Sequence, residues 1–117
     1  MQIVCKLESI EDGGAVEARV DRDNQPSLNL AVCRHGDQVF AWHNICPHQG
    51  RALNFAPNRF LFTPEGQLMC AAHGAVFEAD TGLCVGGPCR GASLRGVAVA
   101  VQNGEVVLTN DDEAADE

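Results

Sequence analysis

The sequence of 117 residues has no tyrosine, few basic residues and no long apolar run. No stretch approaches the roughly 20 apolar residues of a membrane-spanning helix. Residues 1–6 lack a basic segment followed by an apolar run, so the N-terminus does not resemble a signal peptide. We therefore expect a cytoplasmic protein, in which the six cysteines serve as ligands and thiols and not as a disulfide framework.

Basic residues are outnumbered by acidic residues, 8 to 16, which gives a net charge of −8. Five acidic residues lie at positions 111–117; without them 11 acidic and 8 basic residues remain, a net charge of −3. We expect the segment 111–117 to be a disordered, solvated acidic tail. No basic patch is evident, so nucleic-acid binding is disfavoured.

Helix signals are also few, whereas alternating and β-branched segments dominate. The pattern predicts strands at 2–7, 15–20, 28–34, 38–43, 67–70, 76–78, 94–102 and 105–109. Gly36 lies in one predicted hairpin turn and Asn103-Gly104 in another, while 21–27, with Pro26, reads as a polar connection. We predict one all-β domain over 1–110, an antiparallel barrel or sandwich with a smaller lobe inserted at about 45–90.

Two short segments carry the strongest chemical signal. Residues 46–50 read CPHQG and residues 70–74 read CAAHG. We call them the first and second ligand boxes. Cys46 and His48 in the first box, and Cys70 and His73 in the second, offer two thiolates and two imidazoles. This is the ligand set of a Rieske [2Fe–2S] cluster, in which two histidines replace two cysteines on one iron.

The residue types suit this cluster. Its two ferric ions and two sulfides carry about two positive charges, which two thiolates cancel, while neutral imidazoles add none. Zinc is the main alternative, but zinc fingers usually group their cysteines and their histidines separately, with a helix carrying the histidines. Buried thiols without a metal are a further alternative. The mixed boxes favour the iron–sulfur cluster.

The chain resembles a soluble Rieske-type ferredoxin of low potential. Besides the boxes, residues 77–82 resemble the family's aromatic–x–x–x–Thr–Gly turn, and residues 86–88, Gly-Gly-Pro, resemble its third cluster loop. The resemblance covers about 32–108, with 21 residues at 49–69 as a longer spacer than usual. It implies one [2Fe–2S] cluster whose buried iron is bound by the two box cysteines and whose outer iron is bound by the two box histidines.

The resemblance also implies a function. We expect a one-electron carrier, monomeric when free, that takes electrons from a flavin reductase and passes them to a ring-hydroxylating dioxygenase. The chain itself is not expected to be an enzyme, because only two histidines outside the boxes remain for a separate iron site. One alternative is a small subunit of a larger reductase, similar to that of assimilatory nitrite reductase. Another is a metal-stabilised interaction module.

Four cysteines lie outside the ligand boxes. Cys84 and Cys89 bracket the glycine–proline loop, where two thiols are favoured over a disulfide. Cys5 and Cys33 are expected to be small core residues on strands.

Other residues admit two interpretations. Phe55, Phe60 and Phe62 either pack the spacer onto the domain or form an apolar rim that docks a partner. His35 is expected to be a solvated turn residue and His43 a structural one.

The absence of tyrosine bears on the reduction potential. High-potential Rieske proteins resemble this chain in the second box but place a serine and a tyrosine two and four residues after its histidine. Those positions here are Ala75 and Phe77, which donate no hydrogen bond to the cluster. We therefore expect a potential toward the low end of the Rieske range.

Overall fold

The computed structural model describes residues 2–22, 25–45, 52–54, 56, 59–70, 74–87 and 90–109. Within these residues, one short 3₁₀ helix, Leu7–Ser9, is accompanied only by β-strands, and every strand pairing is antiparallel. The expected all-β fold is confirmed. The described residues contain no helix that is long and apolar enough to cross a membrane.

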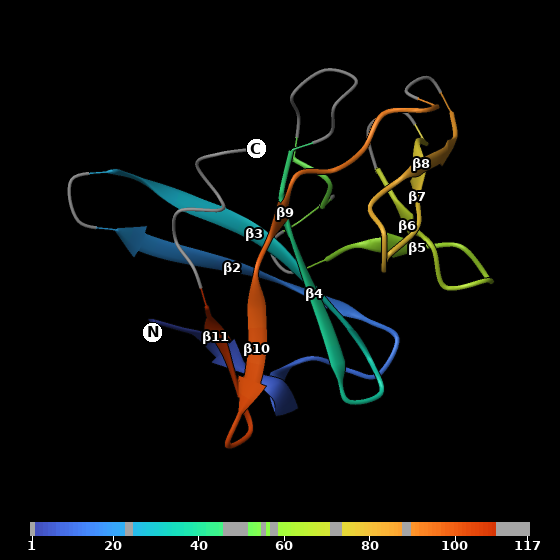
Figure 1. Ribbon diagram of the computed structural model, residues 1–117. Coiled ribbons are helices and arrows are strands. Elements are labelled where there is room, and N and C mark those ends of the chain that lie inside the picture. Colours follow the sequence, from blue (N-terminus) through green and yellow to red (C-terminus); the bar gives the residue numbers. More distant parts are fainter. Residues whose placement is uncertain are drawn as a thin grey trace.

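The strands form three sheets (Figure 1). The first has the order β1 (Gln2–Lys6), β11 (Glu105–Leu108), β10 (Val99–Gln102). The second, which we call the central sheet, has the order β2 (Ala15–Arg22), β3 (Gln25–His35), β4 (Gln38–His43), β9 (Gly96–Val97). The third, the lobe sheet, has the order β5 (Leu61–Phe62), β6 (Leu68–Met69), β7 (Val76–Phe77), β8 (Cys84–Gly86).

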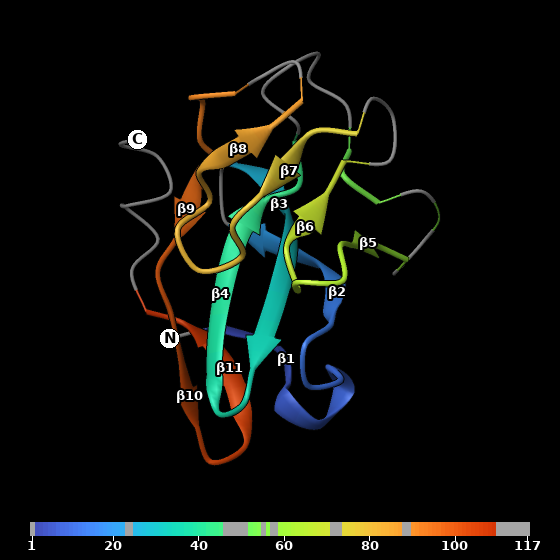
Figure 2. The ribbon, with the colours of Figure 1, turned by 90° about the vertical axis from the view of Figure 1, so that its right-hand side faces the viewer.

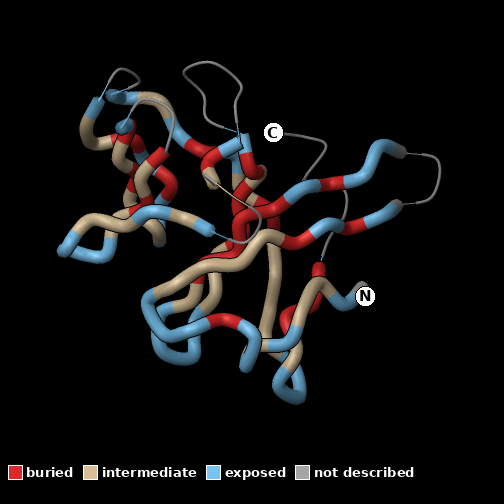
Figure 3. The backbone as a smooth tube through the Cα atoms, turned by 180° about the vertical axis from the view of Figure 1, so that it is seen from behind, coloured by how far each residue is buried: buried red, intermediate tan, exposed pale blue. Residues whose placement is uncertain are grey.

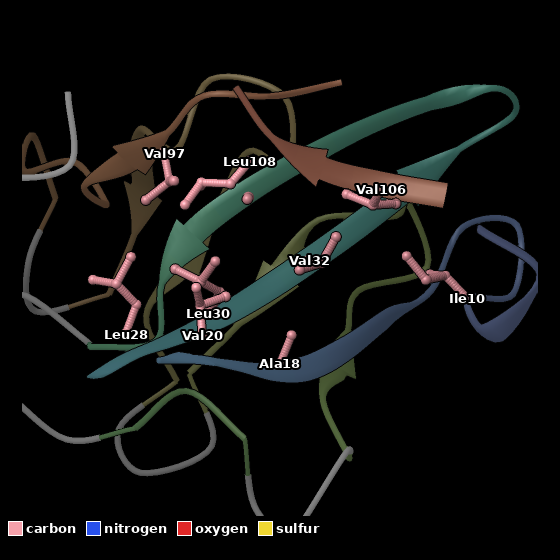
Figure 4. Close-up of a cluster of buried hydrophobic side chains, with 10 residues drawn as sticks. Ile10, Ala18, Val20, Leu28, Leu30, Val32, Val97, Val106 and Leu108 are labelled. Atoms are coloured by element: carbon pink, nitrogen blue, oxygen red, sulfur yellow. The ribbon is translucent and has the colours of Figure 1, made fainter. Parts of the chain in front are cut away.

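The central sheet packs side chains from both of its faces into cores. Because successive side chains of a strand point to opposite faces, Leu30 and Val32 on β3 enter one core while Ala31 and Cys33 enter another. Figure 4 shows the first core, where side chains of β2 and β3 meet Val106 and Leu108 of β11. The central sheet therefore connects the first sheet to the lobe sheet.

The second core fixes the lobe sheet on the central sheet, and Figure 2 shows the lobe strands in front of β3 and β4. Trp42 of β4 enters this core, and its Nε1 donates a hydrogen bond of 3.0 Å to the carbonyl oxygen of Ala79. Leu68 and Phe77 contribute fully buried side chains from β6 and β7. Figure 3 shows that buried segments gather where the sheets meet, and that exposed segments include hairpin tips.

The predicted connection at 21–27 was wrong. β2 continues to Arg22 and β3 begins at Gln25, so Pro26 lies inside a strand. Pairing persists beyond Val20, which faces Leu28, but its register shifts before Arg22 meets Gln25. A proline near the start of a strand is compatible with such pairing, and the side chains of Asp21 and Ser27 are exposed.

The predicted single strand at 94–102 was also wrong. The chain forms β9, which pairs with β4, and then β10, which pairs with β11. Ala98 separates the two strands and accepts a hydrogen bond from Thr109 N at 3.1 Å. The chain passes from the central sheet to the first sheet here, a change that an uninterrupted apolar pattern does not reveal.

Candidate metal centre

The structure describes one of the four predicted ligands, Cys70. Cys46, His48 and His73 lie outside the described residues. Within the described ranges no group of three or more histidine, cysteine or acidic residues could hold a metal ion. The site is therefore built here from Cys70 and from the segments that flank the two ligand boxes.

Cys70 follows β6 and is fully buried in the second core. Its backbone N donates to the Ala75 oxygen at 2.7 Å, and its own carbonyl oxygen accepts from Gly74 N at 2.9 Å. Gly74 has a φ of +75°, which glycine adopts at little cost. These two hydrogen bonds join Cys70, at the start of the second box, to Gly74 at its end and to Ala75 just after it.

The third predicted loop lies against the second box. Gly87 has a φ of +88°, and a Cβ added there would lie 2.7 Å from Ala75 Cα and 3.1 Å from the Gly74 oxygen. At the base of this loop, Cys84 Sγ donates to the Gly86 oxygen at 3.1 Å. Pro88 and Cys89 lie outside the described residues, so the alternative of a disulfide to Cys89 is not tested.

The first box is flanked by a buried asparagine. Asn44 lies two residues before the box, and its Oδ1 accepts a hydrogen bond of 2.8 Å from Leu53 N, after the box. Its Nδ2 donates to Asn54 Oδ1 at 2.9 Å, and its backbone N donates to the Asn29 oxygen at 2.9 Å. The two chain segments on either side of residues 46–51 are thus joined by one side chain.

This asparagine belongs to a larger polar network. Asn54 Nδ2 donates to Glu17 Oε1 at 3.0 Å and to the Ala56 oxygen at 3.0 Å, while Asn29 Nδ2 donates to Glu17 Oε2 at 3.0 Å. The sequence analysis missed Asn44, because asparagine near a loop usually indicates a turn. Only its burial, at 3% exposure, distinguishes it.

The other residues considered in the sequence differ in their burial. Ala75 and Phe77, the two positions without hydroxyl donors, are fully buried. Phe60 and Phe62 are half-buried and pack against the second core, which supports the packing interpretation for these two; Phe55 lies outside the described residues. His35 is exposed, as predicted, but it is the last residue of β3 and precedes the turn.

Two cysteines and a histidine outside the ligand boxes remain. Cys33 is buried, and burial raises the pKa of its thiol to about 12. Cys5 is half-buried against the first core, which also raises the pKa of its thiol. Both are core residues, as expected. His43 is half-buried, with its Nε2 enclosed.

Comparison with known proteins identifies a family. The model of the Rieske [2Fe-2S] domain matches residues 1–111. The ferredoxin of carbazole 1,9a-dioxygenase from Nocardioides aromaticivorans IC177 is 26% identical, with a TM-score of 0.71, and the match covers 93% of this chain and 96% of that chain. The Sphingomonas yanoikuyae B1 ferredoxin is 24% identical, with a TM-score of 0.67, over 92% of this chain and 96% of that one.

A third similar structure contains two proteins. It is a complex of reduced oxygenase and oxidized ferredoxin in carbazole 1,9a-dioxygenase, and the matching chain is 30% identical, with a TM-score of 0.67, over 92% of this chain and 90% of that one. A search of curated protein sequences finds no match.

Proposed function

We propose that this chain, which belongs to the Rieske [2Fe-2S] domain family, is a one-electron carrier between a flavin reductase and a ring-hydroxylating dioxygenase. The family implies one Rieske-type [2Fe–2S] cluster. The observation that carries the proposal is the family match over residues 1–111 together with the similarity to ferredoxins of dioxygenase systems. When bound, the cluster supplies a site that accepts and releases a single electron.

We assign the ligands to Cys46, His48, Cys70 and His73. Two thiolates and two imidazoles are the donor set that this cluster requires. The described part of the site fits the group. Cys70 is buried and hydrogen-bonded to Gly74 and Ala75, and the backbone of Gly87 lies directly against these two residues. The second box and the third loop therefore lie side by side, as two loops that share one compact group would.

Residues around Cys70 influence the reduction potential of the proposed cluster. Burial of Cys70 keeps water away from one ligand sulfur. The side chains of Ala75 and Phe77 are apolar and can donate no hydrogen bond to this sulfur. The negative charge of the reduced cluster is therefore less stabilised than in high-potential relatives. A low potential suits the delivery of electrons to an oxygenase.

The proposed partners are redox proteins. The similar complex pairs a ferredoxin with an oxygenase, which supports an oxygenase as acceptor here. Ile45, 51% exposed immediately before the first box, offers apolar surface for such a contact. We place the chemistry of oxygen and substrate on the oxygenase and not on this chain. The cytoplasmic location and the monomeric state stay predictions.

The cofactor is tested with anaerobically purified protein. We expect about two irons and two sulfides per chain and the electron paramagnetic resonance of a reduced Rieske cluster. Cys70→Ser should abolish or radically change that spectrum. Cys84→Ser is a matched control, because Cys84 is equally buried in the same core but is not a proposed ligand. Stoichiometric zinc without sulfide would overturn the assignment.

The carrier role is tested by electron transfer. Reduced protein, mixed with a dioxygenase and its aromatic substrate, should be reoxidised and support formation of the hydroxylated product. The chain with a chemical reductant and oxygen alone should form none. Product formation by the isolated chain would show that it is itself an oxygenase.

A further inference from the structure

Asn44 is the only buried polar residue in the part of the chain that the structure describes. A buried amide is costly unless its donors and acceptor are satisfied. Here the Oδ1 bonds Leu53 N and the Nδ2 bonds Asn54 Oδ1. Both interactions reach residues on the far side of the first ligand box.

The network allows only one orientation of this amide. Glu17, when ionised, can only accept hydrogen bonds, and it accepts from both Asn29 and Asn54. The Nδ2 of Asn54 therefore faces Glu17, and its Oδ1 faces Asn44. Asn44 must donate to Asn54 and accept from Leu53 N, which a carboxylate or an apolar side chain cannot do.

We propose that Asn44 is the positioning residue of the first ligand box. By joining the chain that enters residues 46–51 to the chain that leaves them, it fixes how Cys46 and His48 are presented to the cluster. Glu17, on β2, sets the direction of the hydrogen bonds that orient it. This inference rests on the proposed function, in which those two residues are ligands.

The central test is Asn44→Asp, which preserves shape. The new carboxylate still accepts from Leu53 N but places a second acceptor against Asn54 Oδ1. We expect about ten-fold faster loss of iron to a chelator and shifted g-values in the electron paramagnetic resonance spectrum, because breaking one buried partner leaves the other unsatisfied.

A rescue variant separates positioning from general damage. In Glu17→Gln, the new amide can keep its oxygen toward Asn54 and donate from its nitrogen to Asn29, whose exposed amide can turn over to accept. This variant alone should therefore lose iron at about the wild-type rate. In the double variant Asn44→Asp/Glu17→Gln, the Asn54 amide can turn over, so that it accepts from the amide at position 17 and donates to the carboxylate at position 44. We expect slower iron loss than in Asn44→Asp alone, although the Ala56 oxygen loses its donor.

Two controls address charge and stability. Asn103→Asp adds the same charge at the exposed β10–β11 turn, and Val106→Ala removes buried volume from the first core. Neither should change the g-values or the rate of iron loss at temperatures well below unfolding. If Asn44→Asp does not fold, Asn44→Ser provides the same two measurements, because its shorter side chain cannot bond both Asn54 Oδ1 and Leu53 N.

The outcomes distinguish the two proposals. A wild-type protein without the cluster would overturn the proposed function itself. A wild-type protein with the cluster, whose Asn44→Asp variant matches Asn103→Asp in iron loss and spectrum, would overturn only the positioning role of Asn44. The same conclusion follows if the effects of the two single variants simply add in the double variant.

Discussion

Gly87 lies so close to Ala75 that a Cβ added to the glycine would stand 2.7 Å from the Ala75 Cα. The two residues belong to different segments, the third loop and the chain just after the second ligand box, and no side chain fits between them. The glycine is required both for this contact and for its φ of +88°.

Gly87→Ala is therefore expected to separate the third loop from the second box. The change introduces a clash with backbone atoms as well as a left-handed backbone conformation, which together should cost roughly 2–4 kcal/mol of unfolding free energy. Iron content after purification and chemical denaturation measure the effect.

Gly91→Ala is the matched control for that prediction. Gly91 has a φ of +94° but no atom within 4 Å of an added Cβ. The variant should lose only roughly 1–2 kcal/mol of unfolding free energy, the cost of the left-handed backbone conformation for alanine. It should retain its iron. Equal behaviour of the two variants would show that the close approach is unimportant.

Gly82→Ala should loosen the lobe sheet from the central sheet. An added Cβ would lie 2.7 Å from Trp42 Cζ3, and the φ of Gly82 is +76°. Displacing the indole should weaken its hydrogen bond to Ala79, and the fluorescence of Trp42, the single tryptophan, should shift to longer wavelength. Gly66→Ala, with a φ of +87° and open space, should leave the fluorescence unchanged.

The buried thiol of Cys33 should make stability depend on alkaline pH. Burial raises its pKa from 9.0 to about 12, so above pH 9 the unfolded chain ionises while the folded chain stays neutral. The neutral thiol of Cys33 therefore makes its full contribution to the unfolding free energy below pH 9, and this contribution falls as pH rises toward 12. Relative to Cys33→Ala, the wild type should lose on the order of 1 kcal/mol between pH 8 and 10. A constant difference would contradict this.

Phe77→Tyr should raise the reduction potential. Phe77 is fully buried in the same core as Cys70, so a hydroxyl there would enter the environment of a ligand sulfur. One added hydrogen bond to the reduced site, worth about 1 kcal/mol, corresponds to roughly 40 mV for a one-electron couple. Protein-film voltammetry measures the midpoint, with Phe60→Tyr as control. An unchanged midpoint would show that the hydroxyl does not reach the sulfur.

Much of the fold could be predicted because the relevant signals are local. Alternation predicted β1, β4 and β11 nearly to the residue. Asn103 and Gly104 both have positive φ, as their hairpin-turn pair requires. The apolar run in β3 predicted a strand but not that its two faces enter different cores.

The two wrong predictions concern segments whose structure depends on the strands that they pair with. The polar residues at 21–27 form part of a hairpin because β2 and β3 continue to pair through them. The segment 94–102 divides between two sheets. Its first part, β9, pairs with β4, and its second part, β10, pairs with β11. Neither partner is visible in the segment itself.

The sequence by itself determined the chemistry of this protein. The types and spacing of the residues in the two boxes predict a cluster with mixed thiolate and imidazole ligands, because coordination depends on which donor atoms are present, and the family match supports the cluster. The tertiary structure alone decided what supports those boxes. Asn44 meets Asn54, and Asn54 meets Glu17 across 37 positions of the chain, and Gly87 meets Ala75. Such contacts arise from the packing of distant segments, which no local pattern of residues encodes.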